Sequence, residues 1–199
     1  MKINNNHNIA CLVLAAGESS RFGSIKQLAP INNQPMLLKK LKELKKIFHS
    51  DLFVVLGAFK EKIQPVIINY ANIIINEHWE DGMSSSISAG INKITANKEY
   101  TSVLIALADQ IKLTSNDYSI LLNSFDGVKI TATKYQHNIG VPAIFPLNYF
   151  EHLERFKGDN GARFFLNNNQ NEINVVTLHS ETIDIDTVED YVAFRNNQT

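Results

Sequence analysis

The chain has 199 residues, of which 44 % are hydrophobic and 20 % are charged, so we expect a folded globular protein rather than a disordered one. It carries 19 basic and 20 acidic residues, and the net charge of −1 argues against a nucleic-acid-binding or basic membrane-binding surface. The single cysteine, Cys11, excludes an internal disulfide and a cysteine-rich metal site, and it is typical of a reducing compartment.

The N-terminus is polar, and the apolar stretch that follows it is too short to span a membrane. We expect residues 1–8 to form a polar tail and residues 9–199 a single domain. A signal peptide that begins at Lys2 is an alternative, but the residues of its cleavage site, Ala15 and Ala16, have a better explanation in the loop described below. We therefore expect a cytoplasmic protein.

Extended and helical patterns alternate along the chain. After a first strand at residues 9–13, Pro35 is suited to the first position of a helix, and apolar residues recur at helical spacing as far as Phe48. The polar positions of this helix carry Lys39, Lys40, Lys42, Lys45 and Lys46. We expect this lysine-rich face to be solvated.

The same alternation continues to the end of the chain. Ser84 is expected to cap one helix, Thr114 to open another and Pro146 to start a third. Further strands are expected at residues 52–56, 72–75, 102–108, 129–133, 141–145 and 173–178, and further helices at residues 60–70, 161–166 and 187–196. This order predicts a three-layer α/β/α fold with a mostly parallel sheet, in which ligands bind at the carboxyl ends of the strands.

The most informative stretch runs from Leu14 to Lys26, directly after the first strand. Gly17 and Gly23 let backbone N–H groups approach an anion, and Arg21 and Lys26 add positive charge. The glycine spacing matches neither the dinucleotide fingerprint nor the P-loop, in which the lysine directly follows the glycine. The stretch predicts a polyphosphate-binding loop; the alternative is a glycine turn with incidental surface cations.

The pattern L-A-A-G-x-S-x-R-[FM]-G-x-x-K resembles the opening signature of the nucleotidyltransferases that attach a nucleotide to molybdopterin, the molybdenum cofactor cytidylyltransferase and MobA-like family. The L-A-A-G form is similar to the cytidylyl branch, whereas the guanylyl branch usually carries L-A-G-G. The resemblance extends over residues 13–191. It implies a Rossmann-like fold of the nucleotide-diphospho-sugar transferase type, with one nucleotidyltransferase domain over residues 9–199.

Asp109 follows an apolar strand, so we expect its carboxylate at the same edge of the sheet as the glycine-containing loop. The run 107–110 resembles the family's L-A-D-Q-P, in which the aspartate binds Mg²⁺; here Ile111 replaces the proline. Mg²⁺ takes one or two carboxylates together with phosphate oxygens, so one such aspartate is useful. Taken alone, an aspartate at a strand end more often caps a turn. Its position relative to the loop favours the metal.

The segment 184–191 resembles the family's closing D-I-D-T-P-E-D-Y, with Val188 in place of the proline. The resemblance implies that Asp186 is a second magnesium ligand. The alternative is that Asp186 or Thr187 caps the last helix and Asp190 completes a capping box. Both can hold, because a helix start also offers backbone donors to a metal-bound phosphate.

The segment 76–86 resembles N-P-x-W-x-x-G-M-x-S-S, with Glu77 where the family has proline. Gly82 lets the backbone approach a flat ring and the serines offer donors, so we expect nucleobase and ribose contacts here; Trp79 is alternatively a core residue. The expected nucleotide-binding residues are Leu14, Ala15, Ala16, Gly17, Arg21, Lys26, Asn76, Gly82, Ser84 and Ser85. The expected catalytic residues are Arg21, Lys26 and Asp109, and the expected metal ligands are Asp109 and Asp186.

Segments 140–145 and 158–163 resemble G-x-P-x-x-F and G-D-x-G-A-R, which border the pterin side of the cleft in the family. The acceptor-binding residues implied by this resemblance are Gly140, Pro142, Asp159 and Arg163. One glycine of a third family motif is missing, because His137 stands two residues after Tyr135. We expect His137 to be a surface residue.

Together these motifs imply a Mg²⁺-dependent CTP:molybdopterin (molybdenum cofactor) cytidylyltransferase that releases pyrophosphate. The implied partners are CTP, molybdopterin or the molybdenum cofactor, and a molybdenum hydroxylase as recipient; no nucleic acid or membrane is expected. Three alternatives stay open: a cytidylyl or guanylyl transferase for another phosphorylated acceptor, a non-catalytic maturation or carrier protein for a molybdenum hydroxylase, and a nicotinamide-binding hydride transferase. Intact Lys26 and Asp109 count against the second, and the missing dinucleotide fingerprint counts against the third.

Overall fold

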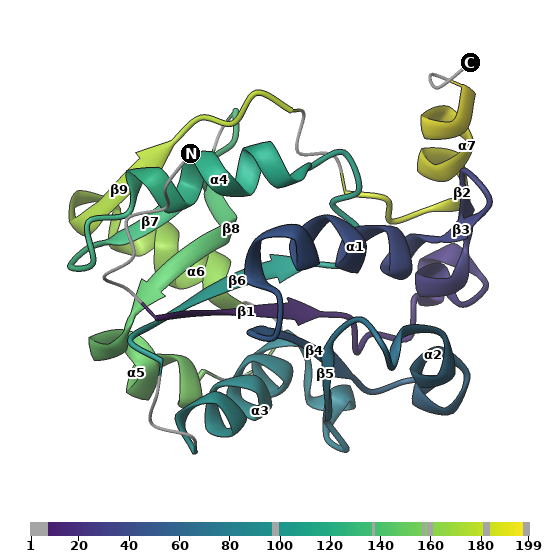
Figure 1. Cartoon of the computed structure of the whole chain (residues 1–199), viewed down its shortest axis with the longest axis horizontal. Coiled ribbons are helices and arrows are strands. Elements are labelled where there is room, and N and C mark those ends of the chain that lie inside the picture. Colours follow the sequence, from purple (N-terminus) through teal and green to yellow (C-terminus); the bar gives the residue numbers. More distant parts are fainter. Residues whose placement is uncertain are drawn as a thin grey trace.

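The computed structural model describes residues 8–96, 100–136, 138–156, 158, 161–180 and 184–196 (Figure 1). All but the last residue of the expected polar tail, residues 1–8, therefore lies outside the described residues. In these ranges no helix combines the length and the apolar character that a membrane span needs.

A sheet of seven strands runs through the centre of the molecule in the order β5-β4-β1-β6-β8-β7-β9. Its strands are β1 (Ile9–Leu14), β4 (Leu52–Leu56), β5 (Asn72–Ile75), β6 (Ser102–Leu107), β7 (Ile130–Lys134), β8 (Ile139–Pro146) and β9 (Ile173–Val176). β8 pairs antiparallel with β6 and β7, and all the other pairs are parallel. The expected mostly parallel sheet is confirmed.

The register of the central strands brings their carboxyl ends to one edge. Leu14, the last residue of β1, lies opposite Val55 of β4 and Leu107 of β6. The residues that follow β1 and β6 therefore leave the sheet side by side. This places the loop after Leu14 next to Asp109.

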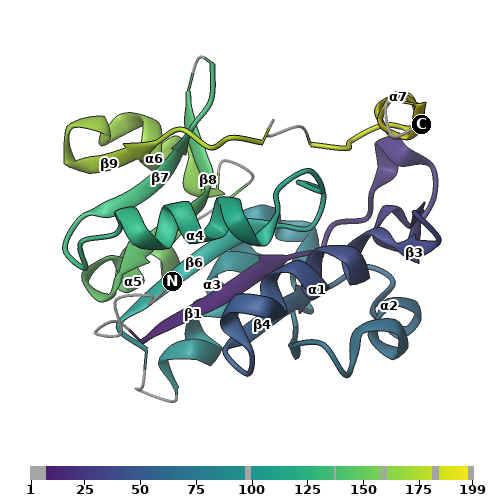
Figure 2. The same cartoon turned by 45° about the horizontal axis from the view of Figure 1, so that its top comes forward.

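Helices cover both faces of the sheet (Figure 1). On one face lie α1 (Met36–Phe48), α2 (Lys60–Ile67) and α4 (Ser115–Ser124), and on the other lie α3 (Met83–Thr95), α5 (Phe150–Glu154) and α6 (Gly161–Asn168). The last helix, α7 (Val188–Asn196), stands beside the short strands β2 (Pro30–Ile31) and β3 (Gln34–Pro35), at the opposite end of the molecule from α6 and β9 (Figure 2). The three-layer α/β/α architecture is confirmed.

Three local expectations are wrong at helix starts. Pro35 directly precedes α1, and Pro146 ends β8, with a short 3₁₀ turn between it and α5. Ser84 does not cap α3, because the helix begins at Met83 after Gly82, whose φ of 93° suits glycine. Thr114, by contrast, forms the expected cap of α4.

The contact between α3 and β1 generates a test of packing. A methyl group at Gly90 of α3 would lie 2.3 Å from Cδ2 of Leu12, which is fully buried. Overpacking a core costs about 1–3 kcal/mol, whereas alanine gains about 1 kcal/mol over glycine in a helix. We therefore expect Gly90→Ala to lower the free energy of unfolding by about 1 kcal/mol in urea denaturation. The exposed Lys93→Ala on the same helix is the control, and an unchanged or higher midpoint for Gly90→Ala would contradict the packing argument.

Candidate functional site

A cavity of about 600 Å³ opens where β1 and β6 end. Its walls are the loop after β1, the start of α3 and the first residues after β6. The sequence-predicted residues among its lining are Leu14, Ala15, Ala16, Gly17, Arg21, Lys26, Gly82, Asp109 and Asp186. The structure thus brings most of the expected nucleotide and metal residues to one place.

Two carboxylates share one ammonium group at the wall of this cavity. Lys26 Nζ lies 2.8 Å from Asp109 Oδ2 and 3.1 Å from Asp186 Oδ1. Arg21 Nη2 lies 3.1 Å from the other oxygen of Asp186. Burial works against the charge of Lys26, but the two carboxylates outweigh it and raise the pKa of Lys26 above its ordinary value. Lys26 is therefore a fixed positive charge at neutral pH.

The carboxylate of Asp109 suits a divalent cation. Its Oδ1 is buried and has no hydrogen-bond partner among the described residues, although buried polar atoms normally have one. No group of three or more His, Cys, Asp or Glu side chains with metal-binding geometry occurs in the described part of the chain. Two carboxylates completed by phosphate and water oxygens are nevertheless a common arrangement for Mg²⁺. The residues present fit that ion.

A small apolar cluster holds the charged segments together. Phe22, Ile111 and Ile185 are buried in it, and each is within two residues of one of the charged side chains described above. Met36, the first residue of α1, packs in the same cluster. Segments that are far apart in the sequence are therefore joined by apolar contacts directly beside the ionic ones.

Asp186 stays available because its neighbours complete the start of α7. Asp190 Oδ2 accepts hydrogen bonds from the backbone N–H and the hydroxyl of Thr187, both at 2.8 Å, and the Asp190 N–H donates to Thr187 Oγ1. This is the capping-box arrangement. The Asp186 carboxylate faces Lys26 and Arg21 instead, so the cap and the ionic contacts coexist.

A second cavity, of about 990 Å³, adjoins the first and shares Leu14, Met83 and Leu107 with it. Gly140 and Arg163, two of the expected acceptor-binding residues, line this cavity. Its other lining residues include Ile87, Ile105, Gln110, Lys134, Tyr135, Val141 and Asp184. The shared wall means that molecules in the two cavities can meet.

A sequence-family model described as a MobA-like NTP transferase domain matches residues 11–173. The chain belongs to this nucleotidyltransferase family. No curated protein matches it by sequence.

Solved structures of nucleotidyltransferases share this fold. They include Rv0371c in complex with manganese from Mycobacterium tuberculosis H37Rv, with a TM-score of 0.81, 20 % identity and coverage of 95 % of this chain and 98 % of that one. A nucleotidyl transferase from Methanothermobacter thermautotroptrophicus has a TM-score of 0.82, 18 % identity and coverage of 97 % and 98 %. CTP:phosphocholine cytidylyltransferase from Streptococcus pneumoniae has a TM-score of 0.72, 16 % identity and coverage of 96 % and 100 %. The expected Rossmann-like nucleotidyltransferase fold is confirmed.

Three residues expected to bind the nucleotide do not line the first cavity of this MobA-like protein. Asn76 is buried and its Nδ2 donates to Ser85 Oγ at 2.8 Å and to Ser86 Oγ at 3.0 Å, which ties the segment after β5 to α3. Asn76 and Ser85 line a separate groove of about 590 Å³. Ser84 is buried in the first turn of α3. Of this segment, Trp79, Gly82 and Ser86 reach the first cavity.

Two of the four expected acceptor-binding residues are not placed in the second cavity. Pro142 is buried within β8, does not line the cavity, and its carbonyl accepts a hydrogen bond of 2.7 Å from Thr133 Oγ1. Asp159 lies outside the described residues, as does His137.

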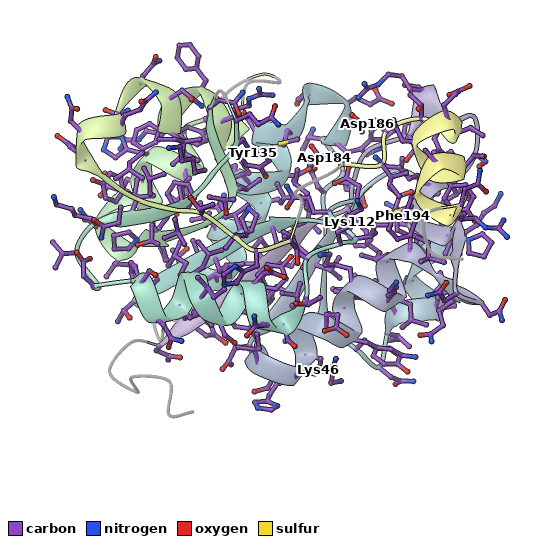
Figure 3. All side chains as sticks on the ribbon, turned by 90° about the horizontal axis from the view of Figure 1, so that it is seen from above. Lys46, Lys112, Tyr135, Asp184, Asp186 and Phe194 are labelled. Atoms are coloured by element: carbon purple, nitrogen blue, oxygen red, sulfur yellow. The ribbon has the colours of Figure 1, made fainter. Side chains whose placement is uncertain are left out.

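Asp184 is a site residue that the sequence analysis missed. It lies between Tyr135 and Asp186 in Figure 3 and lines the second cavity. Burial, followed by the nearby Asp109 carboxylate, raises the pKa of Asp184 to about 6. The signal was present, because side chains two positions apart in an extended segment point the same way, and Asp186 had been singled out.

Lys40 overturns the expectation that all the lysines of α1 are solvated. It is only 2 % exposed, and its Nζ donates to the carbonyl oxygens of Gln110 and Leu113 and to the Tyr118 hydroxyl. Its position three residues after Leu37 places it on the apolar stripe of α1, which the spacing already indicated. Burial is the main cause that lowers the pKa of Lys40 to about 7.

This lowered pKa predicts a dependence of stability on pH. In the unfolded chain the amine has its ordinary pKa of 10.5, so between pH 7 and 9 the unfolded state binds more protons than the folded state. The free energy of unfolding of the wild type should therefore rise, relative to that of Lys40→Met, by about 2 kcal/mol from pH 7 to pH 9. Below pH 7 both states are protonated and the difference should be constant. Urea denaturation at several pH values measures it.

Lys46→Met on the same helix is the control, because Lys46 is exposed and points away from Asp184 and Asp186 (Figure 3). Its difference from the wild type should not change between pH 6 and pH 9. A Lys40→Met difference that is equally constant would show that Lys40 does not release its proton on burial.

Proposed function

We propose that this nucleotidyltransferase is a Mg²⁺-dependent cytidylyltransferase that transfers the cytidylyl group of CTP to the terminal phosphate of molybdopterin or the molybdenum cofactor. The observation that carries the proposal is the contact of Lys26 Nζ with both Asp109 and Asp186 beside the loop after β1. A cation and two carboxylates at one end of a glycine-containing loop suit a triphosphate and its metal. The product would serve a molybdenum hydroxylase.

The first cavity would hold CTP. Backbone N–H groups of the loop around Gly17 would face the triphosphate, while Arg21 and Lys26 neutralise the charge that develops on the departing pyrophosphate. Asp109 and Asp186 would hold Mg²⁺, which supplies neutralisation of phosphate charge when bound. The manganese complex of Rv0371c is consistent with a divalent cation in this fold.

The second cavity would hold the acceptor. Apolar side chains on its wall, such as Ile87 and Ile105, suit the flat ring system of a pterin, and Lys134 and Arg163 supply positive charge for its phosphate. An acceptor phosphate oxygen attacks the α-phosphorus of CTP across the shared wall. The new O–P bond forms as the bond between the α-phosphorus and its bridging oxygen to the β-phosphate breaks, so no side-chain nucleophile is required.

Ala16 would contribute to the choice of base. It is 5 % exposed and lines the first cavity, where its methyl group narrows the space relative to a glycine. A single pyrimidine ring needs less room than a purine. The cytidylyltransferase from Streptococcus pneumoniae, whose printed name includes CTP, has the same fold and supports this choice.

The proposal is tested by measuring pyrophosphate release from each nucleoside triphosphate in the presence of molybdopterin. We expect kcat/KM to be higher for CTP than for GTP, and Ala16→Gly to reduce this ratio by about tenfold, since one methyl group in a tight pocket is worth about 1–3 kcal/mol. Ala71→Gly, outside both cavities, is the control. Preference of the wild type for GTP would refute cytidylyl transfer. Turnover only with another phosphorylated acceptor would refute the molybdopterin assignment, and no turnover with any acceptor would favour a carrier protein.

The metal role of Asp109 gives a second prediction. Asp109→Asn removes one negative charge while keeping the size of the side chain, so we expect turnover to fall below detection with an unchanged circular dichroism spectrum. Asp126→Asn, on the exposed loop between α4 and β7, should retain wild-type turnover. Mg²⁺-dependent turnover at the wild-type rate in Asp109→Asn would rule out the assignment.

A further inference from the structure

The connection from β6 to α4 carries Asp109 and then turns away from the sheet. Within this connection the Ile111 N–H donates to the Asp109 carbonyl at 2.9 Å, and the Ile185 N–H donates to the same oxygen at 3.4 Å. These bonds hold the peptide on the carboxyl side of Asp109. The contacts that fix the next residue, Gln110, come from other parts of the fold.

Gln110 connects the two cavities. Its side chain lines the second cavity, where Nε2 donates to the Tyr135 hydroxyl at 2.8 Å and to the Val141 carbonyl at 3.0 Å. Its backbone carbonyl points the other way and accepts from Lys40 Nζ. Gln110 is 1 % exposed, so its position is set entirely by these neighbours.

Lys40 supplies donors from behind the site. Its ammonium group meets the Gln110 carbonyl, the Leu113 carbonyl at 3.3 Å and the Tyr118 hydroxyl at 3.0 Å, and it lies 5.2 Å from the centre of the Tyr118 ring. It lines neither cavity. Burial of a charged group is unfavourable, and an apolar side chain of similar length would fill the space without that cost. Stability therefore does not account for a lysine here, whereas fixing the two ends of the turn 110–113 does.

We propose that Lys40 is a positioning residue for nucleotidyl transfer: it holds the turn after Asp109 and thereby sets the Asp109 carboxylate relative to the acceptor cavity. This rests on the proposed role of Asp109 as a metal ligand. Lys40 acts through Gln110, so its loss should weaken metal binding and slow the reaction without changing contacts of the loop after β1 with the nucleotide.

The test compares Lys40→Met with Lys46→Met in the full-length protein, using Mn²⁺ as the metal probe. Mn²⁺ binding is followed by calorimetry, and CTP binding in EDTA by the fluorescence of Trp79, the single tryptophan, which lines the first cavity. Lys40→Met should weaken Mn²⁺ binding and lower kcat by about tenfold each, the lower end of the effect of residues that support metal ligands. Metal-free CTP binding and the KM for CTP should stay within about twofold, a split that a general loss of structure would not produce. Lys46→Met should match the wild type throughout.

Tyr118→Phe provides a milder variant, because it removes one acceptor of Lys40 and keeps the ring. It should shift Mn²⁺ binding and kcat in the same direction by about threefold, a smaller part of the same effect. If Lys40→Met does not fold, wild-type Mn²⁺ binding in Tyr118→Phe overturns the proposal.

The remaining outcomes separate this inference from the proposed function. If Asp109→Asn loses Mn²⁺ binding while folded Lys40→Met keeps wild-type Mn²⁺ affinity and kcat, the positioning role is overturned and the metal site stands. If Asp109→Asn binds Mn²⁺ as the wild type does, the metal site and the positioning role are both overturned.

Discussion

The ammonium group of Lys26 between Asp109 and Asp186 is the interaction on which the site depends. These residues belong to three segments that are distant in the sequence, and their side chains are only 13–37 % exposed. Charges at such depth are favourable only with accurate pairing. The shared register of β1 and β6 and the apolar cluster of Phe22, Ile111 and Ile185 supply that accuracy, because they fix the backbone on each side of the ion pairs.

The two adjoining cavities explain how one sheet edge can serve a transfer between two substrates. The first is lined by the loop after β1 and by the carboxylates, and the second by apolar side chains with Arg163 and Lys134. Leu14, Met83 and Leu107 belong to both. Such an arrangement favours catalysis by positioning and charge neutralisation, which is what transfer between phosphates requires.

Lys26 and Lys40 show how the surroundings decide what a lysine does. Burial opposes the charge on both, but Lys26 faces two carboxylates and its pKa is raised, whereas Lys40 faces neutral carbonyl and hydroxyl oxygens and its pKa is lowered to about 7. Ion pairing compensates for lost hydration more fully than hydrogen bonds to neutral groups do. The first lysine is thereby suited to hold phosphate charge, and the second to hold a turn of the backbone.

The sequence by itself determined the central strands, the loop after β1 and the position of Asp109, because apolar runs and the common edge of parallel strands are local or general properties. It also indicated both the cap of α7 and the exposed role of Asp186. Only the tertiary structure decided that β8 runs antiparallel, that Asn76 and Ser85 bond to each other away from the first cavity, and that Lys40 is buried. Periodicity tells which side of a helix or strand a residue occupies, but the partner it meets there comes from a distant segment. Such contacts form only when the chain has folded.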